Sequence, residues 1–459
     1  MCGIVAVTGY KKALPLLING LEKLEYRGYD SAGIAIINSE TKNVSCNKAE
    51  GKLKNLKNNL KNIEIPGTVG IGHTRWATHG KPEVKNAHPH IDSSGEVAVV
   101  QNGIIENYQE LKIKLQKEGI VFNSDTDTEV IPHLIQKELF ALSQLKLENN
   151  GSTLLVAVRN VISDLEGSYA LAVIWSGAPD ALVVARKQAP LIIGLGEGEF
   201  ICASDTPAIA NFTKIILPLE DEEIALLTPL GIEIYDSNNE RQYRNPISLQ
   251  TADQVSDKKN FKHYMLKEIY DQPDIAKYWL EKYLIKDSKT DQFQINYSFE
   301  TEFFNSIERI EIVACGTSKH AAMVGKFLLE QFSGIPTNVF FASEFRYSPP
   351  PLLPNTLTIG VTQSGETADT IAAISMEIKR RSSIGDRNFK PNLIAITNRI
   401  ESSIGRLIPN VINISAGIEI GVAATKTFFG QLLSFYGLAI KLSLIHISEP
   451  TRLRRISYA

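Results

Sequence analysis

A cysteine stands at position 2 of this 459-residue chain, directly after the initiator methionine. Removal of Met1 would leave Cys2 with both a thiol and its own α-amine. That amine titrates near pH ~8, so it could accept the thiol proton and make one residue both nucleophile and base. The alternative is an ordinary buried cysteine at the start of the apolar strand Gly3–Val7.

Three further stretches carry side chains that could bind an amino-acid amide or stabilise the oxyanion formed when it is attacked. Arg75, which follows the expected strand Thr68–Gly72, can grip a carboxylate by two parallel hydrogen bonds. Asn102 and Gly103 follow another apolar strand and predict either a hairpin turn or an oxyanion hole, with the Asn102 amide and the Gly103 N–H as donors. Asp127 could pair with an ammonium group or cap the next helix.

Hydroxyl groups also cluster at two expected strand-to-helix junctions, Cys315–Ser318 and Thr362–Thr367. The N–H groups of a helix start, together with Ser and Thr, can bind a phosphate. Plain N-capping is the alternative for either junction. Two such junctions in one sheet favour a shared phosphate site.

The elements that must position these residues fall into two sets. From residue 2 to 240, β-branched runs predict strands at Ile4–Val7, Gly33–Ile37, Gly67–Gly72, Val97–Val100, Tyr169–Trp175 and Ala181–Ala185. Helical periodicity appears at Lys12–Leu24, Tyr108–Lys117, Thr128–Phe140 and Leu154–Leu165. This mixture predicts two sheets covered by helices, or an α+β layer fold.

The polar stretch 241–300 is expected to connect two domains, with one helix at Phe261–Tyr270 and a loop at Asp287–Ser298. From 301 to 441, strands and helices alternate regularly. That spacing predicts a doubly wound parallel α/β sheet, with ligands at the carboxyl ends of its strands.

Composition excludes several classes of function. The chain has 48 Lys+Arg against 51 Asp+Glu and a net charge of −3, so neither nucleic-acid binding nor an acidic tail is indicated. Apolar runs are too short for a membrane-spanning helix. Four cysteines without disulfide or metal spacing favour the reducing cytoplasm.

Two other patterns suggest sites that we do not expect. Histidines at 73, 79, 88 and 90 lack the spacing of a zinc motif, so no metal is predicted. The glycine-rich run Gly194–Gly198 precedes a strand rather than a helix, which is typical of a hairpin.

Six stretches in order resemble the glutaminase domain of class II amidotransferases. They are Cys2–Val5, Tyr26–Gly33, His73–Gly80, Asn86–His90, Asn102-Gly103 and Ser124–Asp127. The resemblance covers residues 2–240 and implies a four-layer αββα N-terminal-nucleophile hydrolase. Cys2 would form a thioester with glutamine, while Asn102 and Gly103 stabilise the oxyanion. The other implied roles are carboxylate binding by Arg75, amine binding by Asp127, pocket lining by Thr78 and His79, ammonia gating by Trp76, and a place near the nucleophile for Arg27.

Residues 301–441 resemble the sugar isomerase (SIS) domain that binds phosphosugars, through Cys315–Ser318, Ala342–Tyr347, Gln363–Thr367 and Glu419–Lys426. The implied sugar-phosphate site consists of Ser318, Thr362, Gln363, Ser364 and Thr367, with Val422 near the sugar. Thr362 and Ala424 both replace a serine that is common among relatives, and only Thr362 keeps the hydroxyl.

Joined, the two modules resemble the isomerising aminotransferases that use L-glutamine and fructose 6-phosphate. The resemblance implies glucosamine 6-phosphate as product, no cofactor, and a homodimer when full length. The alternatives are another class II amidotransferase of the phosphoribosyl-pyrophosphate type, or a non-catalytic phosphosugar-binding protein.

That family has two tandem sugar isomerase modules, and this sequence contains one. Residues 442–459 look like a translated sequencing adapter rather than native sequence. We therefore expect a truncated chain that keeps glutaminase activity but lacks synthase activity, with the isomerase catalytic residues absent.

Overall fold

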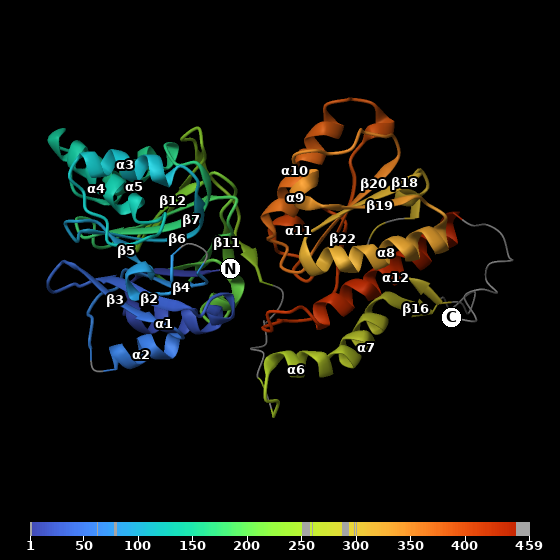
Figure 1. Ribbon diagram of the computed structural model, residues 1–459, viewed down its shortest axis with the longest axis horizontal. Coiled ribbons are helices and arrows are strands. Elements are labelled where there is room, and N and C mark those ends of the chain that lie inside the picture. The colour runs from blue at the N-terminus through green and yellow to red at the C-terminus, as the bar shows by residue number, and fades with distance from the viewer. Residues whose placement is uncertain are drawn as a thin grey trace. The chain divides into compact units, whose positions relative to one another are not determined.

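The computed structural model describes residues 2–61, 63–77, 80–249, 258, 260–286, 293–297, 299 and 301–446 (Figure 1). Its contacts divide the chain into two compact units, Met1–Asp253 and Gln254–Ala459. Thr78 and His79 therefore lie outside the described residues, as do residues 447–459.

Two antiparallel sheets form the centre of the first unit. The first sheet has the order β15-β11-β9-β10-β1-β4-β2-β3. Its strands are β1 (Gly3–Gly9), β2 (Ser31–Ile37), β3 (Val44–Glu50), β4 (Gly70–Arg75), β9 (Ile192–Leu195), β10 (Glu199–Ala203), β11 (Ile215–Pro218) and β15 (Ile247–Ser248). The second has the order β14-β13-β12-β8-β7-β6-β5. Its strands are β5 (His90–Ile91), β6 (Val97–Ile105), β7 (Gly167–Trp175), β8 (Leu182–Lys187), β12 (Ile224–Thr228), β13 (Gly231–Tyr235) and β14 (Arg241–Gln242).

Helices cover the outer face of each sheet (Figure 1). They are α1 (Ala13–Leu24) and α2 (Leu53–Leu60) on the first sheet, and α3 (Tyr108–Lys117), α4 (Val130–Gln144) and α5 (Gly151–Ser163) on the second. Alternate residues of β1 explain the layers: Ile4 and Ala6 pack between the sheets, whereas Val5 and Val7 pack against α1. The four-layer αββα fold is thus confirmed, and β9 and β10 form the expected hairpin.

The second unit contains a parallel sheet with the order β19-β18-β20-β21-β22. Its strands are β18 (Arg309–Ala314), β19 (Thr337–Phe341), β20 (Thr356–Thr362), β21 (Asn392–Thr397) and β22 (Val411–Asn413). The helices that pack on this sheet are α8 (Gly316–Ser333), α9 (Ala342–Phe345), α10 (Ala368–Ser382), α11 (Ser403–Leu407) and α12 (Lys426–His446). The predicted doubly wound sheet is confirmed, and α12 extends past Lys441 to His446.

The stretch expected to be a connection contains regular structure of its own. It includes α6 (Tyr264–Tyr270), α7 (Gln272–Tyr283) and a hairpin of β16 (Leu284–Lys286) with β17 (Phe293–Ile295). The loop prediction was wrong for residues 293–295. Trp279 and Tyr297 from this stretch belong to the same apolar core as α8 and α12. In the described parts of the chain, no helix is long and apolar enough to span a membrane.

Candidate functional site

The thiol of Cys2 lies at the start of β1, beside the end of β4. Its Sγ accepts a hydrogen bond from the Trp76 backbone N–H at 3.3 Å and lies 3.5 Å from the Trp76 carbonyl oxygen. Burial raises the pKa of the Cys2 thiol, although the Trp76 hydrogen bond and the charges of Arg75 and Arg27 act in the opposite direction. A thiol held in this way needs a nearby base to become a nucleophile.

Asn102 and Gly103 lie inside β6, where they pair with Ala170 and Tyr169 of β7. The hairpin-turn interpretation was therefore wrong. The Asn102 Nδ2 donates to the Cys2 carbonyl oxygen at 3.3 Å, so the structure brings these two predicted site residues together. Gly103 has φ +112°, and a Cβ there would lie 2.1 Å from the Ser168 carbonyl oxygen. Only glycine fits this close pairing.

Arg27 fixes the backbone of the nucleophile. Its Nε donates to the Cys2 carbonyl oxygen at 3.0 Å, and its Nη1 pairs with Asp205 Oδ2 at 2.9 Å. The hydroxyl of Tyr26 donates to the same carboxylate at 2.5 Å. Since Arg27 is buried, this network holds the start of β1 rigidly.

Arg75 is the last residue of β4 and is buried, with its Nη1 3.4 Å from the Lys81 carbonyl oxygen. Burial lowers the pKa of its guanidinium, whereas the negative charges of Cys2, Asp127 and Asp30 oppose that shift. Arg75 thus shares one electrostatic environment with Asp127 and the nucleophile. It also belongs to the strand rather than to the loop after it.

Asp127 does not cap the following helix. Helix α4 begins at Val130 without a side-chain cap, and the Asp127 Oδ2 instead accepts the Ile105 backbone N–H at 2.8 Å. The N-cap interpretation was therefore wrong. The bond to Ile105 ties this buried carboxylate to the end of β6, the strand that carries Asn102.

Trp76 follows directly after β4, and its indole packs edge-on against Tyr29 with ring centroids 5.3 Å apart. Gly28 permits this arrangement, because a Cβ at that position would lie 2.6 Å from the Arg75 carbonyl carbon and 2.7 Å from the Trp76 nitrogen. The close approach fixes the chain where it leaves the strand.

Three histidines pack beside this site. The His73 and His88 rings stack at 4.3 Å, and His90 meets His88 edge-on at 4.8 Å. Burial lowers the pKa of His73 to about 3 and holds the pKa values of His88 and His90 well below their usual range. Over the described residues, no group of three or more His, Cys, Asp or Glu side chains is arranged to hold a metal ion.

The second predicted site lies at the carboxyl ends of β18 and β20, which are neighbours in the parallel sheet. The Ser318 Oγ accepts a hydrogen bond from Gln431 of α12 at 2.9 Å. The Thr362 and Thr367 hydroxyls lie 2.6 Å apart. Adjacent parallel strands bring both loops to one edge of the sheet.

The loop that connects β20 to α10, residues 363–367, is held by polar groups of its own and by residues that follow β21. The Ser364 Oγ accepts the Glu366 backbone N–H at 3.1 Å, and the Gln363 carbonyl oxygen accepts the Asn398 N–H at 3.2 Å. Gly365 adopts φ +72°, where a Cβ would lie 1.9 Å from the Ser402 Oγ. Gln363, Ser364 and Thr367 therefore lie in the short turn between β20 and α10, whereas Thr362 ends β20 and Ser318 lies in the first turn of α8.

Val422 is 74% exposed, in the loop that precedes α12. Glu268 of α6 holds this loop, because its carboxylate accepts the backbone N–H groups of Ile420 at 2.6 Å and Gly421 at 3.1 Å. Glu268 itself is fully buried. A segment expected to be only a connection therefore supports the predicted sugar site.

Sequence reasoning missed several contacts at both sites. They involve Ser204 and Asp205 beside the nucleophile, and Glu268 and Gln431 beside the sugar loops. Each partner lies far away in the sequence, so no local spacing signalled it.

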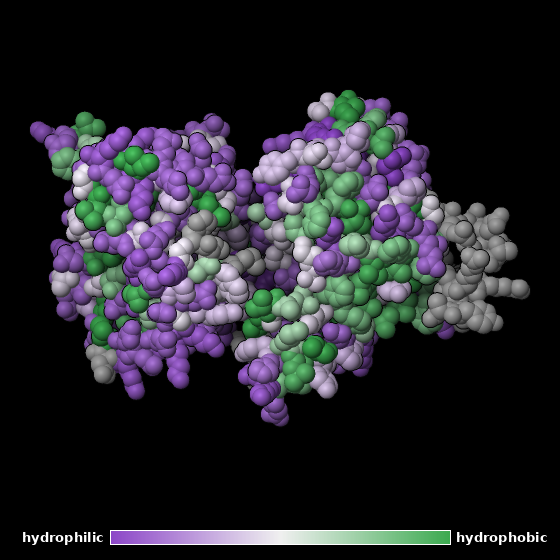
Figure 2. Space-filling model, viewed as in Figure 1, coloured by the Kyte–Doolittle hydropathy of each residue, from purple (hydrophilic) through white to green (hydrophobic). Residues whose placement is uncertain are grey.

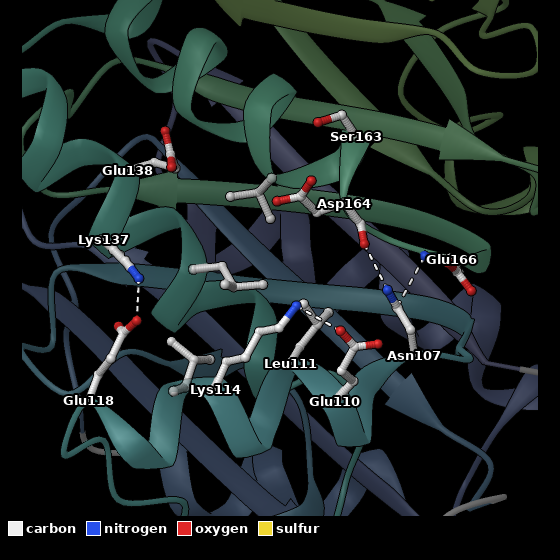
Figure 3. Close-up of a pocket in the computed structure, with 13 residues that line it drawn as sticks. Asn107, Glu110, Leu111, Lys114, Glu118, Lys137, Glu138, Ser163, Asp164 and Glu166 are labelled. Atoms are coloured by element: carbon white, nitrogen blue, oxygen red, sulfur yellow. Dashed lines mark hydrogen bonds and ion pairs between the residues drawn. The ribbon is translucent and has the colours of Figure 1, made fainter.

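A cavity of about 540 Å³ lies on the outer helices of the first unit, away from these residues (Figure 3). Two pairs of its charged side chains bind each other: Lys114 pairs with Glu110 at 2.7 Å, and Lys137 pairs with Glu118 at 2.5 Å. It contains none of the predicted site residues. We therefore assign it no chemistry.

Comparison with known proteins agrees with this division. A glutamine amidotransferase domain model matches residues 73–211, and a SIS domain model matches residues 303–441. The glutamine–fructose-6-phosphate aminotransferase [isomerizing] of Thermosynechococcus vestitus is 55% identical over 447 residues, which are 96% of this chain and 70% of that protein. The enzyme of the same name from Nostoc sp. is 53% identical, with the same coverage.

Among solved structures, the C-terminal domain of the Francisella tularensis glucosamine-fructose-6-phosphate aminotransferase matches with 30% identity and a TM-score of 0.39. That match covers 44% of this chain and 54% of the other. On the strength of the sequence relatives, the chain belongs to the glutamine–fructose-6-phosphate aminotransferase (isomerizing) family.

Proposed function

We propose that this chain hydrolyses glutamine at Cys2 and binds fructose 6-phosphate in its second unit. These are the two binding functions needed to convert glutamine and fructose 6-phosphate into glutamate and glucosamine 6-phosphate. One observation carries the proposal: Trp76, Asn102 and Arg27 converge on the thiol and carbonyl of Cys2.

In the proposed first step, removal of Met1 frees the Cys2 α-amine, which takes the proton of the thiol. The sulfur bonds to the side-chain amide carbon of glutamine, and Asn102 Nδ2 and the Gly103 N–H stabilise the resulting oxyanion. Collapse of this intermediate breaks the C–N bond, and the departing ammonia takes a proton from the α-ammonium group. Water then hydrolyses the thioester, releasing glutamate and restoring the thiol.

The substrate would be held by charges of opposite sign. We assign its carboxylate to Arg75 and its ammonium group to Asp127, both buried beside the nucleophile. Thr78 and His79 would complete the glutamine pocket, and Trp76 would gate the passage of ammonia. The pairing of Trp76 with Tyr29 supports a defined position for that indole.

In the second unit, we assign the sugar phosphate to Ser318, Gln363, Ser364 and Thr367. Thr362 belongs to the same loop, and Val422 would lie near the sugar. Hydroxyl groups at the ends of two neighbouring parallel strands support this assignment. Ammonia would attack the ketose carbonyl while shielded from water, because protonation removes its nucleophilicity. We assign no residue to ring opening or to the isomerisation.

We also propose a cytoplasmic protein that is a homodimer when full length and has no nucleic-acid or membrane partners. Figure 2 shows apolar side chains gathered on the visible face of the second unit. The exposed apolar and aromatic side chains of this unit include Phe327 of α8, Leu280 of α7 and Tyr436 of α12. Such a patch is typical of a protein interface, and a sedimentation measurement of mass would decide the oligomeric state.

The function is tested by measuring glutamate release from glutamine by the purified chain, with and without fructose 6-phosphate. We expect release by the wild type, at least a ~10³-fold loss in Cys2→Ala, and stimulation by the sugar phosphate. Cys46→Ala, which removes a thiol from β3, should retain full activity. Release that is independent of Cys2 would overturn the proposal.

A further inference from the structure

The side-chain amide of Asn102 is held at both ends. Its Oδ1 lies 2.9 Å from His73 Nε2, and its Nδ2 donates to the Ser204 Oγ at 2.8 Å as well as to the Cys2 carbonyl oxygen at 3.3 Å. Asn102, His73 and Ser204 are all buried. The orientation of this amide is therefore decided by protein groups rather than by solvent.

The Cys2 carbonyl identifies which end of the amide faces the nucleophile. A backbone carbonyl only accepts hydrogen bonds, so the NH₂ end of Asn102 must point toward Cys2. In the reverse orientation, the Asn102 Oδ1 would face the Cys2 oxygen, and two acceptors would repel each other. Oδ1 therefore faces His73, and the His73 Nε2 carries the proton.

The two supporting residues are themselves fixed to the elements of the site. The His73 ring stacks on His88, whose Nδ1 accepts the Gln101 backbone N–H at 3.3 Å. The Ser204 Oγ also accepts the Ile4 backbone N–H at 2.8 Å, which ties it to the strand that carries Cys2. Because burial lowers the pKa of His73 to about 3, its ring stays neutral at physiological pH and keeps a single N–H.

We propose that His73 and Ser204 are positioning residues for the Asn102 amide in the glutaminase reaction. They keep one Asn102 N–H on Ser204, so that the other N–H, which makes only the long 3.3 Å contact to the Cys2 carbonyl oxygen, can turn to the oxyanion. The inference rests on the proposed function, in which Asn102 donates to that oxyanion. Without the His73 donor, the amide can turn over and present its carbonyl oxygen, which would repel the negative charge instead of stabilising it.

The test compares three variants in glutamate release. His73→Phe keeps a flat ring against His88 but removes the N–H donor, and Ser204→Ala removes the acceptor at the other end of the amide. His90→Phe is the matched control, because it also removes a buried imidazole contact, to Thr126 at 3.0 Å, without touching Asn102. The rate of Cys2 alkylation by iodoacetamide serves as a second measurement.

For His73→Phe and Ser204→Ala, we expect kcat to fall about 10- to 100-fold, less than the ~10²–10³-fold loss on removal of an oxyanion donor. KM for glutamine and the alkylation rate should stay within about twofold, because Arg75, Asp127 and the Trp76 contacts to the thiol are unchanged. His90→Phe should keep kcat within about threefold.

An unchanged kcat in both test variants would overturn the inference. So would equal losses in His73→Phe and His90→Phe, since these would reflect damage to the histidine cluster alone. If His73→Phe does not fold, Ser204→Ala decides the question from the opposite end of the amide. A wild-type chain without glutaminase activity would instead reject the proposed function, and the inference with it.

Discussion

The two candidate sites differ in what holds their side chains in place. In the first unit, Arg75, Asn102 and Asp127 are 4–7% exposed. Arg75 and Asn102 lie on strands of the two packed sheets, and Asp127 lies in the bend before α4 and is bonded to the end of β6. In the second unit, Gln363, Ser364 and Thr367 stand on the turn after β20, Ser318 lies at the start of α8, and Val422 is 74% exposed. We infer that the first site is preorganised for covalent chemistry, whereas the second is arranged for reversible binding of a polar ligand.

The largest effect that tests this comparison should follow from Asn102→Ala. Loss of one oxyanion donor lowers kcat for glutamine hydrolysis by about 10²–10³-fold, with little change in KM. Steady-state kinetics measure the effect, and Asn58→Ala on the exposed face of α2 is the control. A loss below threefold would mean that Asn102 does not stabilise the transition state.

Two glycines test how rigidly each site depends on close packing. Gly28→Ala forces a Cβ to within 2.6 Å of the Arg75 backbone, and Gly365→Ala forces one to within 1.9 Å of Ser402 Oγ. Each substitution should lower the free energy of unfolding by about 2–3 kcal/mol. Gly28→Ala should also raise KM for glutamine, whereas Gly365→Ala should weaken fructose 6-phosphate binding alone.

Denaturant unfolding, glutaminase kinetics and calorimetric titration with fructose 6-phosphate separate these outcomes. Gly95→Ala is the matched control, because Gly95 also has positive φ, at +77°, but a Cβ there meets nothing within 4 Å. It should cost only about 1 kcal/mol. If both test variants impair both activities equally, the two sites do not depend on local packing in the way described.

The third effect is the acid sensitivity of the first unit. His73, with a pKa of about 3 when folded and about 6.5 when unfolded, binds a proton only in the unfolded chain between those values. Stability is therefore full above pH ~6.5 and is lost as the pH falls. Between pH 7 and pH 5, the free energy of unfolding should drop by about 2 kcal/mol for His73. His88 and His90, whose pKa values burial also lowers, should add losses in the same direction.

Denaturant unfolding at the two pH values checks this prediction. His73→Phe should reduce the drop by about 2 kcal/mol. A pH-independent stability of the first unit would contradict the neutral state of the buried histidines.

The smallest effect is expected at the sugar loop. Ser364→Ala removes one hydroxyl, which should weaken fructose 6-phosphate binding about fivefold, or ~1 kcal/mol, without changing glutaminase activity. Calorimetric titration measures the Kd, and Ser383→Ala, exposed beyond the end of α10, is the control. An unchanged Kd would remove Ser364 from the phosphate site.

The sequence predicted the elements of both units well because their apolar periodicity is strong. It was less informative at Asn102-Gly103, where the same dipeptide is typical of a turn. The strand continues through it because β7 supplies a partner, and the glycine is needed for close approach to the Ser168 carbonyl. A local signal cannot distinguish these two uses of glycine, since tertiary pairing decides between them.

The residues that support each site were largely invisible in the sequence. His73 appeared as one of four clustered histidines and at the start of the stretch His73–Gly80, but without a role of its own. Glu268 lies in a polar stretch that was predicted to be a connection between domains. Their roles depend on partners 29 and 152 residues away. Trp279 and Tyr297 were missed for the same reason, because their apolar rings are scattered among polar residues and meet α12 only in the folded chain.

The packing of α7 against α12 determines where a fragment containing the second unit should begin. The sequence pattern alone would place the start of such a fragment at Thr301, where the strands and helices begin to alternate. That fragment would lack Trp279 and Tyr297, which belong to the core of the second unit. It would also lack Glu268, whose carboxylate accepts the Ile420 N–H and holds that loop. A fragment that keeps α6, α7 and the β16–β17 hairpin, which the contacts group with the second unit, would retain these residues. The shorter fragment would leave an apolar face of α12 exposed to water and the loop at Ile420 without its anchor.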